Sequence, residues 1–218
     1  MNFEIARSNM VEQQIRPWEV LDQRVLDVIA VSPRDRFVPS AYQGIAYSDT
    51  RIPIGHGETM MSPKVEGRLL QALDIQAHER GLEIGTGTGY LTSLLARFAS
   101  HVKSVDIHAD FIASAGDSLA TAGISNVELV TQDAVNEIPE GGPYDFIAIT
   151  GAVSTLDPGY ENLLAVGGRL FAVVGKPPIM EARLIYKTDN NVFTRETLFE
   201  TELKFLNGAE APAEFRFD

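Results

Sequence analysis

Three glycines, Gly85, Gly87 and Gly89, alternate with threonines directly after a short apolar segment that ends at Ile84. Glycine tolerates positive φ and has no Cβ, so a backbone built in this way can lie against a ligand. Residues 90–98 follow with apolar side chains every three or four positions, which predicts a helix. A strand, a glycine-rich turn and a helix in this order are typical of nucleotide sites in α/β sheets. The alternative is a tight connection that binds no ligand.

An acidic residue, Asp106, lies 21 positions after Gly85, near the end of the predicted strand 102–107. In dinucleotide-binding folds, an acid about 20 residues beyond the glycine turn accepts hydrogen bonds from ribose hydroxyls. We therefore predict that Asp106 and its neighbour Ile107 contact a bound nucleoside. The alternative for Asp106 is a solvated acid at the end of a strand.

Two further strand ends carry candidate ligand contacts. Residues 126–131 alternate as a strand, and the Asp133 carboxylate that follows, next to Ala134, can accept a hydrogen bond from an adenine amino group. The near-continuous apolar stretch 143–151 predicts a strand buried on both faces, with Thr150 close to its carboxyl end. Ligands of open α/β sheets bind outside the carboxyl ends of the strands. For Asp133, a turn-forming role is the alternative.

A polar loop, residues 52–63, precedes these elements and contains two glycines on either side of His56. The hydroxyls of Thr59 and Ser62 follow before Pro63. A loop of this composition can hold unusual backbone angles and present polar groups to a ligand. The alternative is a simple connector into the predicted helix 64–73.

The remaining elements indicate one domain, residues 1–218, in two parts. Residues 3–15 and the stretch after Asp22 read as helices, so residues 1–75 are predicted to form an N-terminal helical extension that carries the polar loop. In the core, residues 76–218, strands alternate with helices until the strands expected at 182–186 and 197–203, which follow one another directly. We predict an α/β fold with a Rossmann-like, doubly wound, mostly parallel sheet and an antiparallel hairpin at its C-terminal edge.

Composition narrows the class of protein. The 218 residues suffice for a well-buried core, and no apolar run reaches the ~20 residues that a membrane span needs. A net charge of −12 without a basic tract argues against a nucleic-acid partner. Cysteine is absent and the four histidines lack metal-binding spacing, so we expect no disulfide and no metal site. A cytoplasmic location fits this composition. The sequence does not predict the oligomeric state.

Several stretches, in order, resemble the protein-L-isoaspartate O-methyltransferase family over nearly the whole chain. They include residues 10–15, 37–39, 55–59, 82–90 and 167–170, among which Gly-His-Gly-x-Thr is specific to that family. The resemblance implies S-adenosylmethionine (AdoMet) as the cofactor and methyl transfer to the carboxylate of L-isoaspartyl residues in damaged proteins. Proteins or peptides containing isoaspartate are then its partners. The implied cofactor-binding residues are Glu83, Gly85, Thr86, Gly87, Gly89, Tyr90, Asp106, Ile107, Asp133, Ala134 and Thr150.

The polar loop departs from the family pattern. After Gly-His-Gly-Gln-Thr the family has an aliphatic residue and then the active-site serine, whereas here Glu58 replaces the glutamine and Met61 the serine. A serine, Ser62, follows one place late, so the candidate acceptor-site residues are His56, Thr59, Met61 and Ser62. Because a thioether donates no hydrogen bond, Met61 favours methyl transfer to another small-molecule or protein acceptor. A non-catalytic AdoMet-binding protein is a third hypothesis.

Overall fold

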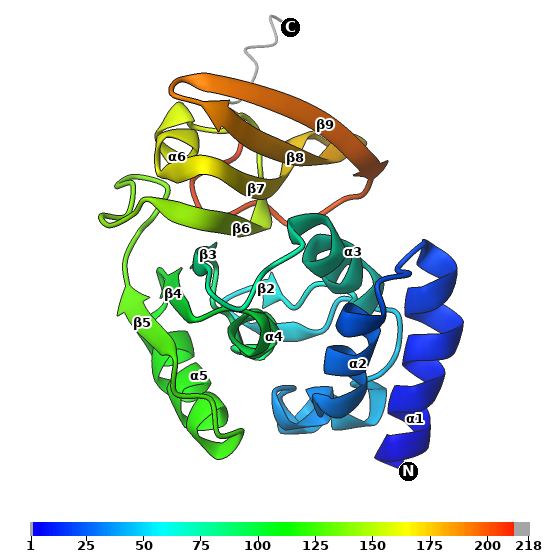
Figure 1. The fold of residues 1–218 in the computed structure, drawn as a ribbon. Coiled ribbons are helices and arrows are strands. Elements are labelled where there is room, and N and C mark those ends of the chain that lie inside the picture. The colour runs from blue at the N-terminus through cyan, green and yellow to red at the C-terminus, as the bar shows by residue number, and fades with distance from the viewer. Residues whose placement is uncertain (1, 212–218) are drawn as a thin grey trace, which may run out of the picture.

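Within residues 2–211, which the computed structural model describes, seven strands form one sheet through the middle of the molecule (Figure 1). They lie in the order β5-β4-β3-β6-β7-β8-β9, and β8 and β9 are the strands that run antiparallel to their neighbours. The mostly parallel sheet and its antiparallel C-terminal hairpin confirm the predicted fold. The strands are β3 (Arg80–Ile84), β4 (His101–Asp106), β5 (Val127–Thr131), β6 (Tyr144–Val153), β7 (Leu164–Lys176), β8 (Ile179–Asp189) and β9 (Val192–Glu200).

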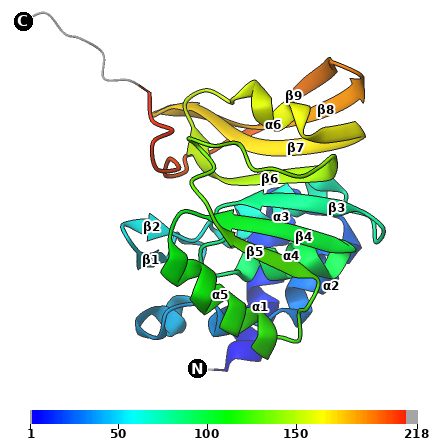
Figure 2. The ribbon, with the colours of Figure 1, turned by 90° about the vertical axis from the view of Figure 1, so that its left-hand side faces the viewer.

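Both faces of the sheet are buried, because the side chains of its central strands alternate between two hydrophobic clusters. In β6, Phe146 and Ala148 belong to one cluster, whereas Ile147 and Ile149 belong to the other. The first cluster includes apolar residues of the helices α3 (Pro63–Leu73), α4 (Tyr90–Phe98) and α5 (Ala109–Thr121). The second includes Tyr160 of the short helix α6 (Pro158–Asn162), which lies with loops against the opposite face (Figure 2).

The N-terminal extension packs beside α3 and α4 (Figure 1). It consists of α1 (Phe3–Met10), a π-helical stretch (Val11–Ile15), a 3₁₀ turn (Arg16–Trp18) and α2 (Gln23–Val31). Asp22 caps α2, since its carboxylate accepts a hydrogen bond from the Arg24 N–H at 2.8 Å. Among the described residues, no helix is both long and apolar enough to cross a membrane.

The polar loop folds into a two-stranded hairpin that the sequence did not predict, β1 (Pro53–Gly55) with β2 (Glu58–Thr59). Its turn depends on positive φ angles of 114° at Gly55, 51° at His56 and 72° at Gly57. Upstream, residues 34–36 and 40–45 form 3₁₀ turns. The hairpin leads directly into α3, the helix expected after the loop.

After β9 the chain returns to the carboxyl end of the parallel strands. The strand expected at 197–203 ends earlier, at Glu200, and residues 203–207, here called the C-terminal segment, pair loosely with β6. The Ala152 N–H donates to the Lys204 carbonyl at 2.8 Å, and the Leu206 N–H donates to the Ala152 carbonyl at 2.9 Å. The irregular tail expected at 209–218 lies largely outside the described residues.

Candidate functional site

The glycine loop connects β3 to α4 and adopts backbone angles that favour glycine. Gly85, Gly87 and Gly89 have φ values of 98°, 52° and 80°. A Cβ at Gly85 would also collide with the Thr150 hydroxyl at the end of β6. That hydroxyl lies 2.8 Å from the Ile84 carbonyl and 2.9 Å from the Gly85 carbonyl, so it can donate to either. The loop is therefore held close to β6.

Asp106 ends β4 and supports the same loop. One carboxylate oxygen accepts from the Gly87 N–H at 2.8 Å, and the other accepts from the His108 N–H at 2.9 Å. Each oxygen retains a lone pair, so the side chain can still accept from a ligand hydroxyl. The geometry fits the predicted ribose contact and gives Asp106 a second role in ordering the loop.

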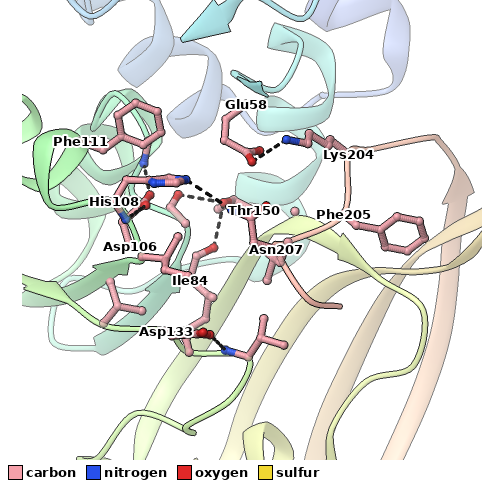
Figure 3. Close-up of a pocket in the computed structure, with 18 of the residues that line it drawn as sticks. Glu58, Ile84, Asp106, His108, Phe111, Asp133, Thr150, Lys204, Phe205 and Asn207 are labelled. Carbon is pink, nitrogen blue, oxygen red and sulfur yellow. Dashed lines mark hydrogen bonds and ion pairs between the residues drawn. The ribbon is translucent and has the colours of Figure 1, made fainter. Parts of the chain in front are cut away.

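A cavity, here called the main cavity, opens at the carboxyl ends of β3, β4, β5 and β6 (Figure 3). This is the position of ligands in open α/β sheets. The β1–β2 hairpin and the C-terminal segment contribute further walls. The predicted cofactor residues that line it are Gly85, Gly87, Asp106, Ile107, Asp133, Ala134 and Thr150.

Asp133 combines both roles considered for it. Its carboxylate accepts from the Val135 and Asn136 N–H groups, each at 3.1 Å, and from the Asn136 side chain at 2.7 Å. The side-chain hydrogen bond from Asn136 is the main reason that the pKa of Asp133 is lowered. Asp133 thus forms a turn, and it does so at the wall of the main cavity.

Glu83 lies beneath the glycine loop and lines neither cavity. In β3 it points to the face covered by α4, where its side chain is fully buried and accepts from the Thr92 hydroxyl at 2.5 Å and the Ser104 hydroxyl at 2.6 Å. The Ser104 hydroxyl is also 2.6 Å from that of Thr86 in the loop. Burial raises the pKa of Glu83 to about 8, although the two hydrogen bonds lower it. In place of the predicted ligand contact, this geometry gives Glu83 a supporting role behind the loop.

A smaller cavity, here called the inner pocket, adjoins the main cavity beside the glycine loop. The predicted cofactor residues Thr86 and Tyr90 line it, together with Thr88 and, from α3, Glu66. Gly89 lines neither cavity and occupies the N-cap position of α4. The two cavities share the lining residues Ile54, Thr59, Met61, Gly85, Gly87 and Thr150, so a ligand can extend from one into the other.

The candidate acceptor-site residues separate in the structure. Thr59 and Met61 line both cavities. Ser62 lines neither, because it is the N-cap residue of α3, where its carbonyl accepts from the Val65 N–H at 3.0 Å. Ser62 is therefore not positioned to replace the missing serine at Met61.

His56 also lies outside the lining of both cavities. Its ring stacks on that of His108 with 4.0 Å between centroids, and its Nε2 atom is 2.9 Å from an Asp110 carboxylate oxygen. His108 is half-buried and lines the main cavity.

Lys204 is the main functional candidate that the sequence did not indicate. Its ammonium group lies 2.6 Å from a Glu58 carboxylate oxygen at the wall of the main cavity (Figure 3). Among the described residues that line this cavity, Lys204 is the only lysine or arginine. It belongs to an irregular segment without a motif, and only the return of the chain to β6 brings it to the site.

Comparisons with known proteins agree with this geometry. The family model described as Protein-L-isoaspartate(D-aspartate) O-methyltransferase matches residues 5–206. A protein-L-isoaspartate O-methyltransferase from Methanoculleus marisnigri is 38% identical over 188 residues, which cover 86% of each chain. Another, from Koribacter versatilis, is 34% identical over 185 residues, covering 85% of this chain and 83% of its own.

A solved structure gives the same picture of the fold. The structure, from Plasmodium falciparum and in complex with S-adenosyl-L-homocysteine, superposes with a TM-score of 0.77 and covers 94% of this chain and 98% of its own. Its sequence is 20% identical to this chain. The similarity therefore concerns the arrangement of the strands and helices around the site.

Proposed function

The chain belongs to the protein-L-isoaspartate(D-aspartate) O-methyltransferase family, and we propose that its main cavity binds AdoMet beside an acceptor site formed by Thr59, Met61 and Lys204. The enzyme transfers a methyl group from AdoMet to the carboxylate of L-isoaspartyl residues in damaged proteins. The observation that carries the assignment of the site is that one cavity contains the Asp106 carboxylate, the glycine loop and the Lys204 ammonium group.

The residues of the main cavity fit AdoMet. Asp106 has free lone pairs for ribose hydroxyls, Asp133 is an acceptor at the third strand end, and Ile107 and Ala134 supply apolar surface for a base. The glycine loop reaches the wall of the same cavity at Gly85 and Gly87. When bound, AdoMet supplies an electrophilic methyl group on a positively charged sulfur.

The reaction does not require an ionisable side chain that acts as an acid or a base. A carboxylate acceptor has a pKa near 4 and is already ionised at pH 7, so it needs no general base. One of its oxygens attacks the methyl carbon, the carbon–sulfur bond breaks, and the bonding electrons remain on sulfur. Since two opposite charges are neutralised, the protein contributes mainly by alignment and exclusion of water. The resulting ester can cyclise to a succinimide and reopen in part as normal aspartate.

In the proposed site, the positively charged ammonium group of Lys204 aligns the isoaspartyl carboxylate. Met61 lies where the family has serine, and its thioether cannot donate a hydrogen bond. Lys204 carries three donors and lies on the wall of the same cavity, where it pairs with the Glu58 carboxylate. We infer that the isoaspartyl carboxylate takes the place of Glu58 on Lys204.

Methylation of one isoaspartyl peptide by wild type and Lys204→Gln tests this assignment. Loss of a charge-assisted hydrogen bond costs about 1.5–3 kcal/mol, so the KM for the peptide should rise at least ~10-fold. The affinity for S-adenosylhomocysteine should be unchanged. Lys187→Gln, a substitution on strand β8 outside the cavity lining, is the matched control. An unchanged KM in Lys204→Gln would remove Lys204 from the acceptor site.

A second candidate function retains AdoMet and changes the acceptor. It is favoured by Met61, which faces the cavities while Ser62 does not. The variant Met61→Ser decides between the two, because an oriented donor at a reacting centre contributes about 10²-fold in rate or more. If isoaspartate is the acceptor, the variant should methylate the peptide faster than wild type. A wild type that is inactive on the peptide and not rescued by Met61→Ser would identify a different acceptor.

We also propose a cytoplasmic location and protein or peptide partners. The net charge of −12 and the scattered basic residues disfavour a nucleic-acid partner, because a phosphate backbone is attracted by clustered positive charge. The absence of cysteine is compatible with a reducing compartment. Fractionation of the source cells, followed by immunodetection, tests the location.

A further inference from the structure

A histidine of the β1–β2 hairpin and two residues at the start of α5 meet beside the main cavity. His56 lies in the turn of the hairpin, His108 is the N-cap residue of α5, and Asp110 lies in the first turn of that helix. One potential metal-ligand atom from each of the three side chains lies within 4.8 Å of the other two. The proposed methyl transfer uses none of these side chains.

The chemistry of the three groups suits a zinc ion. Two imidazole nitrogens and one carboxylate oxygen are ligands that Zn²⁺ binds, and sites with three protein ligands commonly add a water molecule as the fourth. Mg²⁺ and Ca²⁺ prefer sets made of oxygen atoms alone. Imidazole selects for Zn²⁺ and its neighbours among the transition metals. The donor set therefore points to Zn²⁺ rather than to the alkaline-earth cations.

The distances require only a modest adjustment. In a tetrahedral site with Zn–N bonds of about 2.0–2.1 Å, the ligand atoms lie about 3.3 Å apart. The widest separation in the cluster, at most 4.8 Å, must then shorten by up to about 1.5 Å. Rotation of side chains can supply this, because 44% of the His56 side chain and 66% of the Asp110 side chain are exposed.

The existing contacts hold the ligands near one another without blocking the site. The His56 and His108 rings are stacked, and Phe111 packs edge-on against both, with its centroid 5.2 Å and 5.1 Å from theirs. The hydrogen bond between His56 Nε2 and Asp110 is exposed, and such pairs contribute little to stability, so a metal ion can replace it. The amide nitrogen of Asn207 lies 3.3 Å from His108 Nε2, and this contact is retained if the metal binds Nδ1.

Electrostatics at this position depend on Asp110. The first turn of a helix carries partial positive charge, which disfavours a cation. The Asp110 carboxylate supplies a full negative charge in that same turn and offsets this effect. Asp110 is therefore the ligand whose charge the site requires most.

We propose that His56, His108 and Asp110 bind one Zn²⁺ ion, with water as the fourth ligand, and that the ion ties the β1–β2 hairpin to α5. The hairpin contributes Glu58 and Thr59 to the main cavity, and the start of α5 contributes His108. The ion thus joins two walls of this cavity. Sequence spacing does not reveal the site, because His56 lies 108 − 56 = 52 positions before His108.

Calorimetric titration of the full chain with ZnCl₂, without any nucleoside, tests the site independently of the proposed function. Wild type should bind one Zn²⁺ per chain, and excess Mg²⁺ should not displace it. His56→Asn, which tolerates the positive φ of the turn, and Asp110→Asn should each weaken binding at least ~10-fold. His101→Asn is the matched control. His101 lies 3.8 Å from a Glu128 carboxylate oxygen in a pair outside the cluster, so this variant should bind like wild type.

Amide hydrogen exchange measured by mass spectrometry tests the tie between the two elements. Zn²⁺ should slow exchange in residues 53–59 of wild type and leave it unchanged in His56→Asn. If His56→Asn does not fold, Asp110→Asn, at an exposed position, replaces it in both measurements. A wild type that binds no Zn²⁺, or binding that both variants retain, overturns the site. An equal loss in His101→Asn would identify adventitious surface binding and also overturn it. Binding that leaves exchange in the hairpin unchanged overturns the tie.

Discussion

Replacing Glu83 with glutamine should remove a pH dependence of stability that the wild-type protein carries. Glu83 is fully buried beneath the glycine loop, where burial raises the pKa of its carboxyl group to about 8 from the ordinary 4.5. Between these two values the folded protein binds a proton that the unfolded chain releases. The free energy of unfolding should therefore be highest below pH 4.5, as far as this group is concerned, and fall as the pH rises toward 8.

The size of the effect follows from the same two values. A pKa difference of about 3.5 units corresponds to about 5 kcal/mol, since one unit is about 1.4 kcal/mol. This is an upper limit, because local relaxation or entry of water at high pH reduces the cost of ionisation. Glutamine can still accept from the Thr92 and Ser104 hydroxyls through its carbonyl oxygen, and it never ionises.

Urea unfolding of wild type and Glu83→Gln at several pH values from 5 to 8.5 measures the difference. We expect the wild type to lose a few kcal/mol more than the variant over this range. Glu128→Gln, at an exposed position on β5, is the matched control and should follow the wild type. Parallel curves for wild type and Glu83→Gln would refute the argument that burial holds a proton on Glu83.

Two further predictions concern the ligand and the partners. Asp106→Ala should weaken binding of S-adenosylhomocysteine by roughly 1–3 kcal/mol, the cost of unpaired ribose hydroxyls, and unchanged affinity in calorimetry would show that the ribose lies elsewhere. Given the net charge of −12, RNA and DNA should not bind at physiological salt. A gel shift at micromolar protein that weakens steeply with added salt would contradict this.

Sequence patterns predicted the structural features whose geometry depends on residues close together in the chain. The glycine loop, the helix that follows it and Asp106 belong to one strand–turn–helix unit, whose geometry depends on residues within about 25 positions. The alternation of strands and helices predicted the sheet for the same reason, and the cavity formed where the carboxyl ends of its strands meet.

The features that were missed depend on distant parts of the chain. Lys204 reaches the cavity through pairing of the C-terminal segment with β6, which no local pattern encodes. The orientation of Glu83 follows from strand alternation only once Ile84 is known to face the opposite cluster. The start of α3, which takes Ser62 as its N-cap residue, leaves Met61 and not Ser62 in the cavity lining.

In the proposed acceptor site, the Glu58 carboxylate occupies the position on Lys204 that we infer for the substrate carboxylate. Both groups are partly exposed, and ion pairs of this kind contribute only about 0–1 kcal/mol, so a competing carboxylate displaces Glu58 at little cost. Lys204 then exchanges one carboxylate for another and is never left without a counterion. The family carries glutamine at the position of Glu58, which cannot act in this way. In the proposed site, an acidic side chain of a protein substrate therefore competes with Glu58 for the Lys204 ammonium group.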